Sequence, residues 1–487
     1  MKLRTILNGL EELKAKGNLD EEITSIAYDS RKVKEDGVFV AIKGFNVNGH
    51  DYIAQAVQKG VKAVVVQDGE KIKKSDFNED TVIVVAPDTR IALAKMSANF
   101  FGNPTRKLKT IGVTGTKGKT TTTYMIKEIL EKAGHKVGLI GTIANYIGNE
   151  KIGDNHSRTT PESLELQEMF SKMVEQNVEI AVMEVSSQSL KLNRVYGIDF
   201  DMAIFTNFTE DHISPNEHPN MEDYFNCKLE LIKNAKKSYI NADDYNVAKI
   251  KTMLKDKDIS TFGIDNMADM LAKDVTIRNT SVDFRAKING KNERIKVGIP
   301  SRFTVYNALA AFCVVNNFGV TIDQTREALE QIAVPGRMEM VPNKKGLNIM
   351  IDYAHSPASL ESVLKAVKAY TRGRVISVFG CGGDRDTKKR PIMGEISGKN
   401  AAYTIITSDN VRTENPEDIV KQIEEGIKHT KTQYKVIVDR EEAIKYAISI
   451  ANKNDMIVLS GKGHENYEEI NGKRYPFDER KIVQKYA

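Results

Sequence analysis

Residues 112–122 read Gly-Val-Thr-Gly-Thr-Lys-Gly-Lys-Thr-Thr-Thr, and this stretch decides the fold of the central part of the chain. The β-branched and apolar residues of 107–113 predict a buried strand before it, and the apolar residues of 120–133 recur at helical spacing after it. Glycines allow a tight loop between the two elements, where backbone N–H groups and the helix dipole favour an anion. The sequence therefore predicts a phosphate-binding loop at a strand–helix junction.

The chemistry of this loop depends on its lysine and threonine. Lys119 is placed to reach the β- and γ-phosphates of a nucleotide, and the Thr120 hydroxyl is placed to bind Mg²⁺. The full motif needs glycine at position 113, where Val113 stands, so its core here is Gly115-x-x-Gly118-Lys119-Thr120. The alternative is a glycine-rich turn that binds no ligand.

Composition limits the other classes of function. The chain has 487 residues, enough for about three domains of roughly 150 residues. Its net charge of +5 comes from 71 basic and 66 acidic residues without a long basic run, so nothing indicates nucleic-acid binding or membrane association. The cysteines Cys227, Cys313 and Cys381 lie far apart, which argues against a disulfide framework or a thiolate zinc site.

The N-terminal residues and the lengths of the apolar stretches bear on the cellular compartment of the protein. Leu7, Leu10 and Leu13 have the spacing of an amphipathic helix, and no signal-peptide core is visible. No stretch of 18 apolar residues occurs, so we expect no transmembrane helix and a cytoplasmic protein.

Three α/β domains are expected. Residues 1–106 form a small α/β domain that ends at the breaker Gly102-Asn103-Pro104. Residues 107–335 alternate strands and helices, which predicts a doubly wound, mostly parallel sheet around the phosphate loop; within them Asn289-Gly290 marks a hairpin between 275–285 and 294–299. Residues 336–487 follow Pro335-Gly336 and predict a Rossmann-like α/β domain.

Three polar residues of the central domain are candidates for metal binding. Glu184 ends an apolar strand and can supply a second Mg²⁺ ligand, or it is an ordinary strand-end acid. His212 lies in a polar loop after the next strand. Lys228 lies on a mostly apolar helix, where it either extends to solvent or reacts with CO₂ to give an anionic carbamate for a second Mg²⁺. Composition leaves both alternatives for Lys228 open.

Four polar loops follow strands in the third domain. Because the carboxyl ends of parallel strands meet at one edge, these loops predict a second binding site. The loops are 352–357, 381–386, 409–412 and 461–465.

The motifs resemble those of a known family. Gly115–Thr121 is similar to the ATP loop of the Mur ligases and the folylpolyglutamate synthetases. Further matches occur in family order over essentially the whole chain and favour Mur ligases that add a diamino acid. They are Asp29-Ser30-Arg31, Thr159-Thr160-Pro161, Glu184-Val185-Ser186-Ser187, Asp211-His212, Val334–Glu339, Asp352-Tyr353-Ala354-His355, Gly380–Asp386 and Gly461–Glu465.

This resemblance implies an ATP-dependent amide ligase of peptidoglycan precursor synthesis, acting on UDP-N-acetylmuramoyl-L-alanyl-D-glutamate. The D-glutamate carboxyl would become an acyl phosphate, which the amine of a diamino acid attacks. Mg²⁺ and a carbamate on Lys228 would be the cofactors. One chain carries a full set of site residues, so we expect a monomer.

The resemblance also assigns roles by position. Lys119, Lys228 and His212 would be catalytic, and Thr120, Glu184, His212 and Lys228 would hold metal. ATP would contact Gly115, Thr116, Lys117, Gly118, Lys119, Thr120, Thr121, Asn307, Arg337, Asp352 and His355. The UDP-muramoyl dipeptide would contact Ser30, Thr159, Thr160, Ser186 and Arg194. The amino acid would contact Arg385, Asp409, Asn410, Val411, Arg412, Gly461 and Glu465.

Two signals disagree about the amino acid that is added. Arg385 and Arg412 suit the distal carboxylate of meso-diaminopimelate, which we favour, although Val411 replaces the proline usual in that motif. Residues 212–219 are similar to the branch that adds L-lysine. A folylpolyglutamate synthetase and a phosphate-loop nucleotide switch are weaker alternatives, because neither accounts for both the first domain and the loops of the third.

Overall fold

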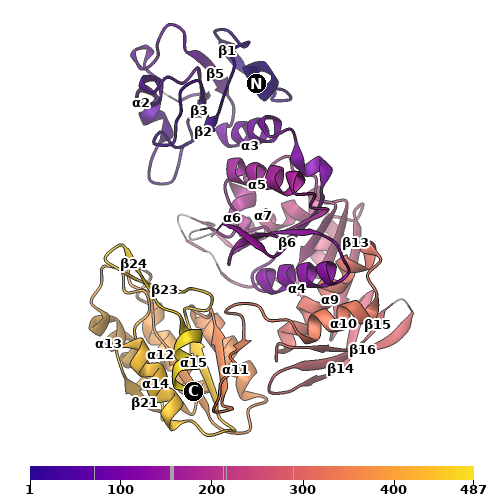
Figure 1. Cartoon of the computed structure of the whole chain (residues 1–487), viewed down its shortest axis with the longest axis vertical. Coiled ribbons are helices and arrows are strands. Elements are labelled where there is room, and N and C mark those ends of the chain that lie inside the picture. Colours follow the sequence, from indigo (N-terminus) through magenta and orange to yellow (C-terminus); the bar gives the residue numbers. More distant parts are fainter. Residues whose placement is uncertain (71, 154–157, 212, 215–216, 289) are drawn as a thin grey trace. The chain divides into compact units, whose positions relative to one another are not determined.

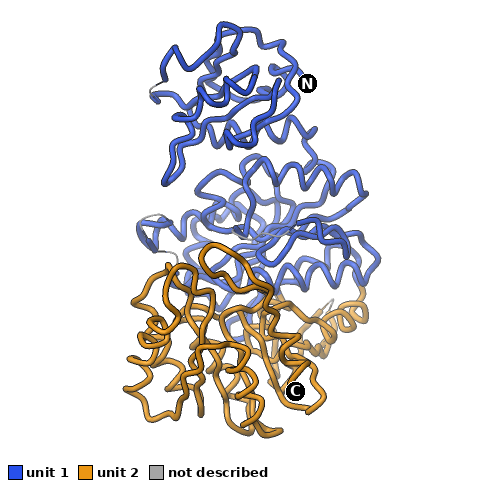
Figure 2. Tube along the Cα trace, turned by 60° about the vertical axis from the view of Figure 1, so that its left-hand side comes forward, with its two compact units in different colours: residues 1–269, 310–320 blue, residues 270–309, 321–487 orange. Residues whose placement is uncertain are grey.

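A computed structural model describes residues 1–487 except 71, 154–157, 212, 215–216 and 289 (Figure 1). The chain forms two compact units, shown in blue and orange in Figure 2. Unit 1 comprises Met1–Asp269 and Ala310–Val320, and unit 2 comprises Met270–Leu309 and Thr321–Ala487. The division into domains 1–106, 107–335 and 336–487 stays a prediction.

The N-terminal part of unit 1 contains a five-stranded sheet in the order β1-β5-β4-β3-β2. Strands β2 to β5 pair in parallel, and β1 pairs antiparallel with β5. The strands are β1 (Lys14–Lys16), β2 (Ile26–Ala27), β3 (Val38–Val40), β4 (Ala63–Gln67) and β5 (Val82–Ala86), and the helices are α1 (Leu3–Ile6), α2 (Ile53–Gln58) and α3 (Thr89–Phe100).

The prediction of an amphipathic helix that includes Leu13 is wrong. Helix α1 has four residues, and Gly9 follows it with a left-handed φ of 74°. Leu10 and Leu13 pack against the core of the first sheet from an irregular segment. Their spacing therefore records burial rather than helical periodicity.

The central sheet of unit 1 carries the phosphate loop. The strands that unit 1 contributes lie in the order β13-β12-β11-β6-β10-β7-β8-β9, parallel from β13 to β7 and antiparallel in β8 and β9. The strands are β6 (Lys109–Thr114), β7 (Val137–Ile140), β8 (Asn145–Ile147), β9 (Glu150–Gly153), β10 (Ile180–Glu184), β11 (Met202–Phe205), β12 (Lys237–Asn241) and β13 (Asp258–Gly263). The helices are α4 (Lys119–Lys132), α5 (Ser163–Glu175), α6 (Ser187–Lys191), α7 (Met221–Asn234) and α8 (Val247–Met253).

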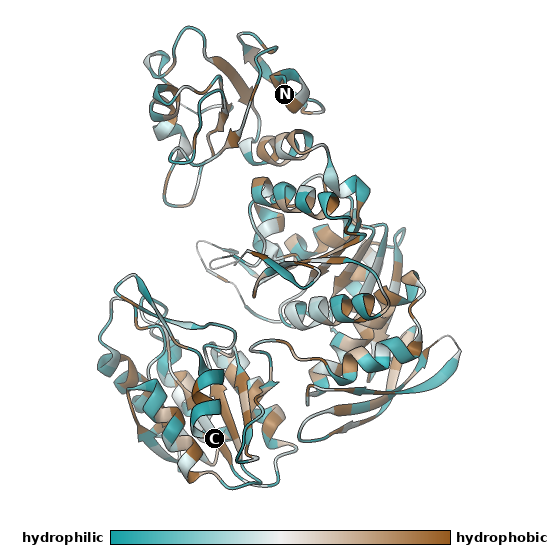
Figure 3. Cartoon of the chain, in the orientation of Figure 1, coloured by the Kyte–Doolittle hydropathy of each residue, from teal (hydrophilic) through white to brown (hydrophobic). Residues whose placement is uncertain are grey.

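Helices α4 and α5 lie on opposite sides of this sheet (Figure 1). Strand β10 is buried along its whole length, because a parallel sheet covered on both faces has no solvent face. Figure 3 shows the consequence: apolar strands lie between helices whose outer faces are polar.

Unit 2 contains an antiparallel meander and a mostly parallel sheet. The meander consists of β14 (Met270–Ile277), β15 (Val282–Ile288) and β16 (Lys291–Val297). The strands flanking the Asn289-Gly290 turn are thus β15 and β16, whereas 275–277 belong to β14; Asn289 lies outside the described residues. Helices α9 (Arg302–Val315) and α10 (Ile322–Glu330) follow.

The second sheet of unit 2 has the order β17-β18-β22-β19-β20-β21, with only β17 antiparallel. The strands are β17 (Glu339–Met340), β18 (Asn348–Asp352), β19 (Val375–Phe379), β20 (Tyr403–Ile406), β21 (Gln433–Val436) and β22 (Met456–Ser460), with a separate hairpin of β23 (Tyr467–Ile470) and β24 (Lys473–Pro476). The helices are α11 (Pro357–Lys368), α12 (Lys389–Asn400), α13 (Pro416–Ile427), α14 (Arg440–Ile450) and α15 (Glu479–Tyr486).

This order makes β18, β22, β19 and β20 neighbours, so the four polar loops leave one sheet edge, as the sequence predicted. Among the described residues, no helix is long and apolar enough to cross a membrane.

Candidate functional site

The phosphate loop joins β6 to α4 in unit 1. Gly115 and Gly118 have left-handed φ values of 139° and 87°, which only glycine adopts readily. A Cβ on Gly115 would lie 1.9 Å from Thr206 Oγ1, and the Thr116 N–H donates to Asn207 O at 2.8 Å. The loop is therefore held against the segment that follows β11.

Two lysines meet on one carbonyl of this loop. Lys119 Nζ donates to Gly115 O at 2.9 Å and to Thr116 O at 3.0 Å, and Lys228 Nζ donates to the same Gly115 oxygen at 2.9 Å. Lys228 comes from α7 and is 1% exposed. Burial, and then the nearby charge of Lys119, holds the pKa of Lys228 well below the usual lysine value. An amine with a lowered pKa is more often neutral and nucleophilic.

Glu184 is a fully buried carboxylate at the end of β10. Its Oε2 accepts from Thr120 Oγ1 at 3.0 Å and from Thr142 Oγ1 at 2.9 Å, and its Oε1 accepts from Thr142 N at 2.8 Å. Among the described residues, no basic side chain forms an ion pair with it. Because a buried charge without a counter-ion is costly, this arrangement fits a bound cation, and hydroxyl and carboxylate oxygens suit Mg²⁺.

The residues predicted to hold the muramoyl dipeptide lie together. Thr160 Oγ1 donates to Glu184 O at 2.9 Å and accepts from Ser186 N at 3.1 Å, and Arg194 Nη1 donates to Thr160 O at 3.2 Å. Thr159 Oγ1 lies 3.2 Å from Thr142 Oγ1.

A cavity of about 250 Å³ opens beside these residues. It is lined by Lys119, Arg158, Thr159, Ser186, Ser187, Gln188, Arg194, Glu217, His218 and Lys228. The cavity thus brings the phosphate-loop lysine and Lys228 together with predicted dipeptide residues.

The sequence analysis missed several residues of this region. Thr142 follows β7, a strand that we did not anticipate, although a polar residue after a strand was the signal used elsewhere. Arg158 lines the cavity and lies 3.4 Å from Glu162, which also pairs with Arg194 at 3.3 Å. A lone arginine beside the Thr-Thr-Pro motif carried no signal of its own.

One predicted metal ligand of unit 1, His212, lies outside the described residues. Ser30 does not line this cavity. Ser30 is buried near the N-terminal sheet, where its Oγ donates to Gln55 Oε1 at 2.8 Å and its carbonyl accepts from Lys59 Nζ at 2.7 Å.

Unit 2 brings together three of the predicted nucleotide contacts. The Arg337 guanidinium lies 4.8 Å from the centre of the Tyr353 ring, and Asp352 Oδ2 accepts from Met338 N at 2.8 Å. His355 Nδ1 donates to Tyr353 O at 2.8 Å. The fourth residue, Asn307, is buried on α9.

The loops after β19, β20 and β22 converge as expected. Asn410 Nδ2 donates to Glu465 Oε2 at 2.7 Å, and Arg412 Nη1 donates to Gly383 O at 2.7 Å. A Cβ on Gly382 would lie 3.0 Å from Arg412 Nη1 and 3.8 Å from Arg385 Cγ, so both arginines border this glycine.

The pKa values of two acids in these loops, Glu465 and Asp409, shift in opposite directions. Burial, and then the charge of Asp409, raises the pKa of Glu465. Burial acts to raise the pKa of Asp409 as well, but the cations of Lys462 and Arg440 outweigh it and lower that pKa. Gly461 packs so closely that a Cβ on it would lie 2.4 Å from Asp409 Oδ2.

The predicted amino-acid residues do not all share one cavity. Asp409 and Val411 line a cavity of about 580 Å³ together with Arg440, Glu468 and Phe477. Asn410 and Glu465 instead contact each other, and Arg412 contacts Gly383. The 409–412 motif therefore has two faces, which the sequence did not show.

The chain combines a phosphate loop on a doubly wound sheet with a Rossmann-like sheet that carries polar loops at one edge, an arrangement suited to an enzyme that uses a nucleotide. Three family models match this chain: the Mur ligase family catalytic domain over 22–101, the Mur ligase middle domain over 113–315, and the Mur ligase glutamate ligase domain over 336–463.

Individual proteins match over nearly the full length. UDP-N-acetylmuramoyl-L-alanyl-D-glutamate–2,6-diaminopimelate ligase 1 of Clostridium acetobutylicum is 48% identical, covering 100% of this chain and 99% of its own. A solved structure of a UDP-N-acetylmuramoyl-L-alanyl-D-glutamate–2,6-diaminopimelate ligase matches with a TM-score of 0.71 at 28% identity, covering 99% of this chain and 98% of its own.

A MurF ligase of Thermotoga maritima in complex with ADP matches in fold, with a TM-score of 0.60 at 21% identity over 90% of this chain and 93% of its own. The chain belongs to the Mur ligase family.

Proposed function

We propose that this ligase joins meso-diaminopimelate to UDP-N-acetylmuramoyl-L-alanyl-D-glutamate in peptidoglycan precursor synthesis, as a monomer in the cytoplasm. The observation that carries the choice of amino acid is the placement of both Arg385 and Arg412 beside Gly382. The full-length relative at 48% identity bears the name of this activity.

The reaction needs an activated carboxyl group, because a carboxylate is a poor electrophile. ATP supplies the γ-phosphoryl group, the glutamate carboxylate becomes an acyl phosphate, and the attacking amine displaces phosphate. Lys119 neutralises charge on the transferring phosphoryl group, and the N–H groups of residues 115–121 hold the phosphates.

Thr120 and Glu184 would hold one Mg²⁺, supported by the contact between them and by the burial of Glu184 without a basic partner in the part of the chain that the structure describes. The ion would supply charge neutralisation to the β- and γ-phosphates. Lys228 as a carbamate, with His212, would hold a second Mg²⁺. The lowered pKa of Lys228 supports this role, because only the neutral amine reacts with CO₂.

The muramoyl dipeptide would occupy the 250 Å³ cavity, in contact with Thr159, Thr160, Ser186 and Arg194. Ser30 would serve the uridine end in a first domain of residues 1–106. Residues 107–335 would bind ATP, with Asn307, Arg337, Asp352 and His355 also contacting the nucleotide.

Residues 336–487 would select the amino acid. Two guanidinium groups pair with the distal carboxylate of meso-diaminopimelate, which L-lysine lacks. The other residues proposed to contact the amino acid are Asp409, Asn410, Val411, Gly461 and Glu465. L-Lysine remains the second candidate, supported by the sequence of residues 212–219.

ADP release by the purified protein tests this proposal. The reaction contains ATP, Mg²⁺, the UDP-muramoyl dipeptide, and either meso-diaminopimelate or L-lysine. We expect release to require both the nucleotide sugar and meso-diaminopimelate. Release that is independent of the nucleotide sugar would contradict the ligase function, and a preference for L-lysine would correct only the amino acid.

A further inference from the structure

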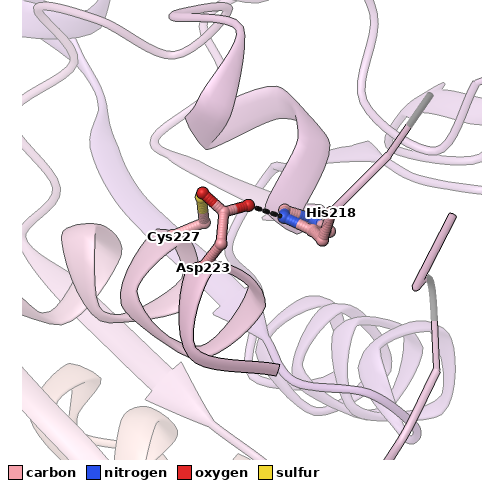
Figure 4. A group of neighbouring side chains, drawn as sticks. All are labelled: His218, Asp223 and Cys227. Atoms are coloured by element: carbon pink, nitrogen blue, oxygen red, sulfur yellow. Dashed lines mark hydrogen bonds and ion pairs between the residues drawn. The ribbon is translucent and has the colours of Figure 1, made fainter. Parts of the chain in front are cut away.

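Three side chains form a hydrogen-bonded line at the wall of the 250 Å³ cavity. Asp223 Oδ2 lies 2.6 Å from His218 Nδ1, and His218 Nε2 lies 2.9 Å from Ser187 Oγ (Figure 4 shows the first of these contacts). His218 is fully buried, yet it and Ser187 both line the cavity. We name these three residues the relay.

The contacts fix the direction of hydrogen bonding in the relay. A carboxylate only accepts, so His218 Nδ1 carries the proton that it donates to Asp223. Burial lowers the pKa of His218, which keeps the ring neutral near pH 7 and leaves Nε2 as the acceptor of the Ser187 hydroxyl proton. The charged groups that face the ring are Asp223, Lys191 and Lys228, and the Tyr224 ring packs 5.0 Å from it.

His218 and Asp223, together with Cys227, could also be considered as ligands of a metal ion. Ligand atoms of His218, Asp223 and Cys227 lie within 4.8 Å of one another, a grouping found among the described residues (Figure 4). However, Lys191 Nζ donates to Asp223 Oδ2 at 2.8 Å, so an ammonium group already neutralises this carboxylate. These side chains are therefore better suited to moving a proton than to holding a cation.

Amide formation requires a proton acceptor. An amine that attacks an acyl phosphate becomes positively charged and must lose a proton as the amide forms. Ser187 lies one residue after Ser186 and lines the same cavity as Thr159 and Arg194, which are assigned above to the dipeptide. An acceptor on this wall would face the reacting carboxyl group.

We propose that Ser187 Oγ takes the proton of the attacking amine and passes its own proton to His218 Nε2. This inference rests on the proposed function. The C–N bond forms as the C–O bond to phosphate breaks, and phosphate leaves with the electron pair. Asp223 stabilises the imidazolium, which returns its proton to water after product release. Ser187 is the catalytic residue, and His218 and Asp223 are positioning residues.

The experiment separates the two half-reactions in the intact protein. Acyl phosphate is measured without amino acid by trapping with borohydride, and amide formation is measured with meso-diaminopimelate. In Ser187→Ala we expect acyl phosphate within about twofold of wild type and amide formation lowered about 10²-fold or more. His218→Gln and Asp223→Asn should show smaller losses with the same division.

The pH profile supplies the second readout. Raising the pH supplies hydroxide, which can take the proton of the attacking amine in place of Ser187, so the deficit of Ser187→Ala should shrink towards high pH. Ser187→Thr retains a hydroxyl and should retain most amide formation. Equal loss of both half-reactions, or a deficit that does not change with pH, would overturn the relay.

Cys227→Ser is the matched control, because Cys227 lies beside Asp223 but outside the relay. We expect both half-reactions within about twofold of wild type. A selective loss of amide formation in Cys227→Ser would favour a metal site and contradict the proposal. Wild-type turnover tests the proposed function and the ratio of half-reactions in variants tests the relay, so the two can fail separately.

Discussion

The charged residues beside the phosphate loop of unit 1 and the two predicted substrate arginines of unit 2 differ in their burial. Glu184 and Lys228 are buried, and each is tied to the loop region by hydrogen bonds below 3.1 Å. Arg385 is exposed, and Arg412 is only half-buried and donates to a backbone carbonyl. A buried, preorganised charge suits a chemical step, whereas an accessible one suits capture of a substrate from solution. Variants in unit 1 should therefore change turnover, and variants in unit 2 should change amino-acid affinity.

The largest effect is expected for Lys119→Met. Loss of the ammonium group removes charge neutralisation from the transferring phosphoryl group, so kcat should fall about 10³-fold with the fold retained. ADP release measures kcat, and thermal melting measures whether the fold is retained. Lys132→Met, at the other end of α4, is the control and should behave as wild type. A rise in KM with little change in kcat in Lys119→Met would contradict the expectation that unit 1 governs turnover.

The next effect concerns Lys228 and pH. Its amine must be neutral to take up CO₂, and burial lowers its pKa, so carbamylation should be favoured at neutral pH and lost as the pH falls below that pKa. Removing CO₂ should reduce activity about 10²-fold, and bicarbonate should restore it. Lys228→Met should be inactive to the same degree with or without bicarbonate.

Enzyme in ¹³C-bicarbonate gives a direct check by NMR of the carbamate carbon. Lys233→Met, on the same helix but partly exposed, should keep both the signal and the response to CO₂. Full activity of the wild type without CO₂ would contradict the carbamate.

A smaller and more selective effect is expected for Arg412→Ala. Loss of a charge-assisted pair with a carboxylate costs about 1.5–3 kcal/mol, so KM for meso-diaminopimelate should rise roughly 10- to 100-fold. KM values for ATP and the UDP-muramoyl dipeptide should not change. Arg372→Ala, an exposed arginine of unit 2, is the control. Unchanged KM for meso-diaminopimelate would remove Arg412 from the amino-acid site.

The smallest effect is expected for Thr142→Val. The variant loses the hydroxyl hydrogen bond to Glu184 but keeps the backbone one, so the carboxylate is oriented less firmly. The Mg²⁺ concentration for half-maximal activity should rise about 10-fold. Thr252→Val, whose hydroxyl bonds only within α8, should not alter the Mg²⁺ response. An unaltered response in Thr142→Val would argue against Glu184 as a ligand.

Much of this molecule could be predicted from the sequence because its strongest signals are local. The phosphate loop needs glycines, a lysine and a threonine within a few residues, and each buried strand needs a continuous apolar run. The four polar loops of unit 2 could be placed at one edge because parallel strands share their direction. Leu13 shows the limit, since its helical spacing reflects packing against the core of the N-terminal sheet.

The family, the nucleotide loop and the alternation of strands with helices could be predicted from the sequence alone, since these follow from patterns among neighbouring residues. The meeting of Lys119 and Lys228 on Gly115, the support of Glu184 by Thr142, and the line of Ser187, His218 and Asp223 are visible only in the folded chain. These contacts join residues up to 113 positions apart in the chain. Burial and hydrogen-bond direction arise only when such segments pack together, and they set which groups are neutral, which are charged and which face the cavity.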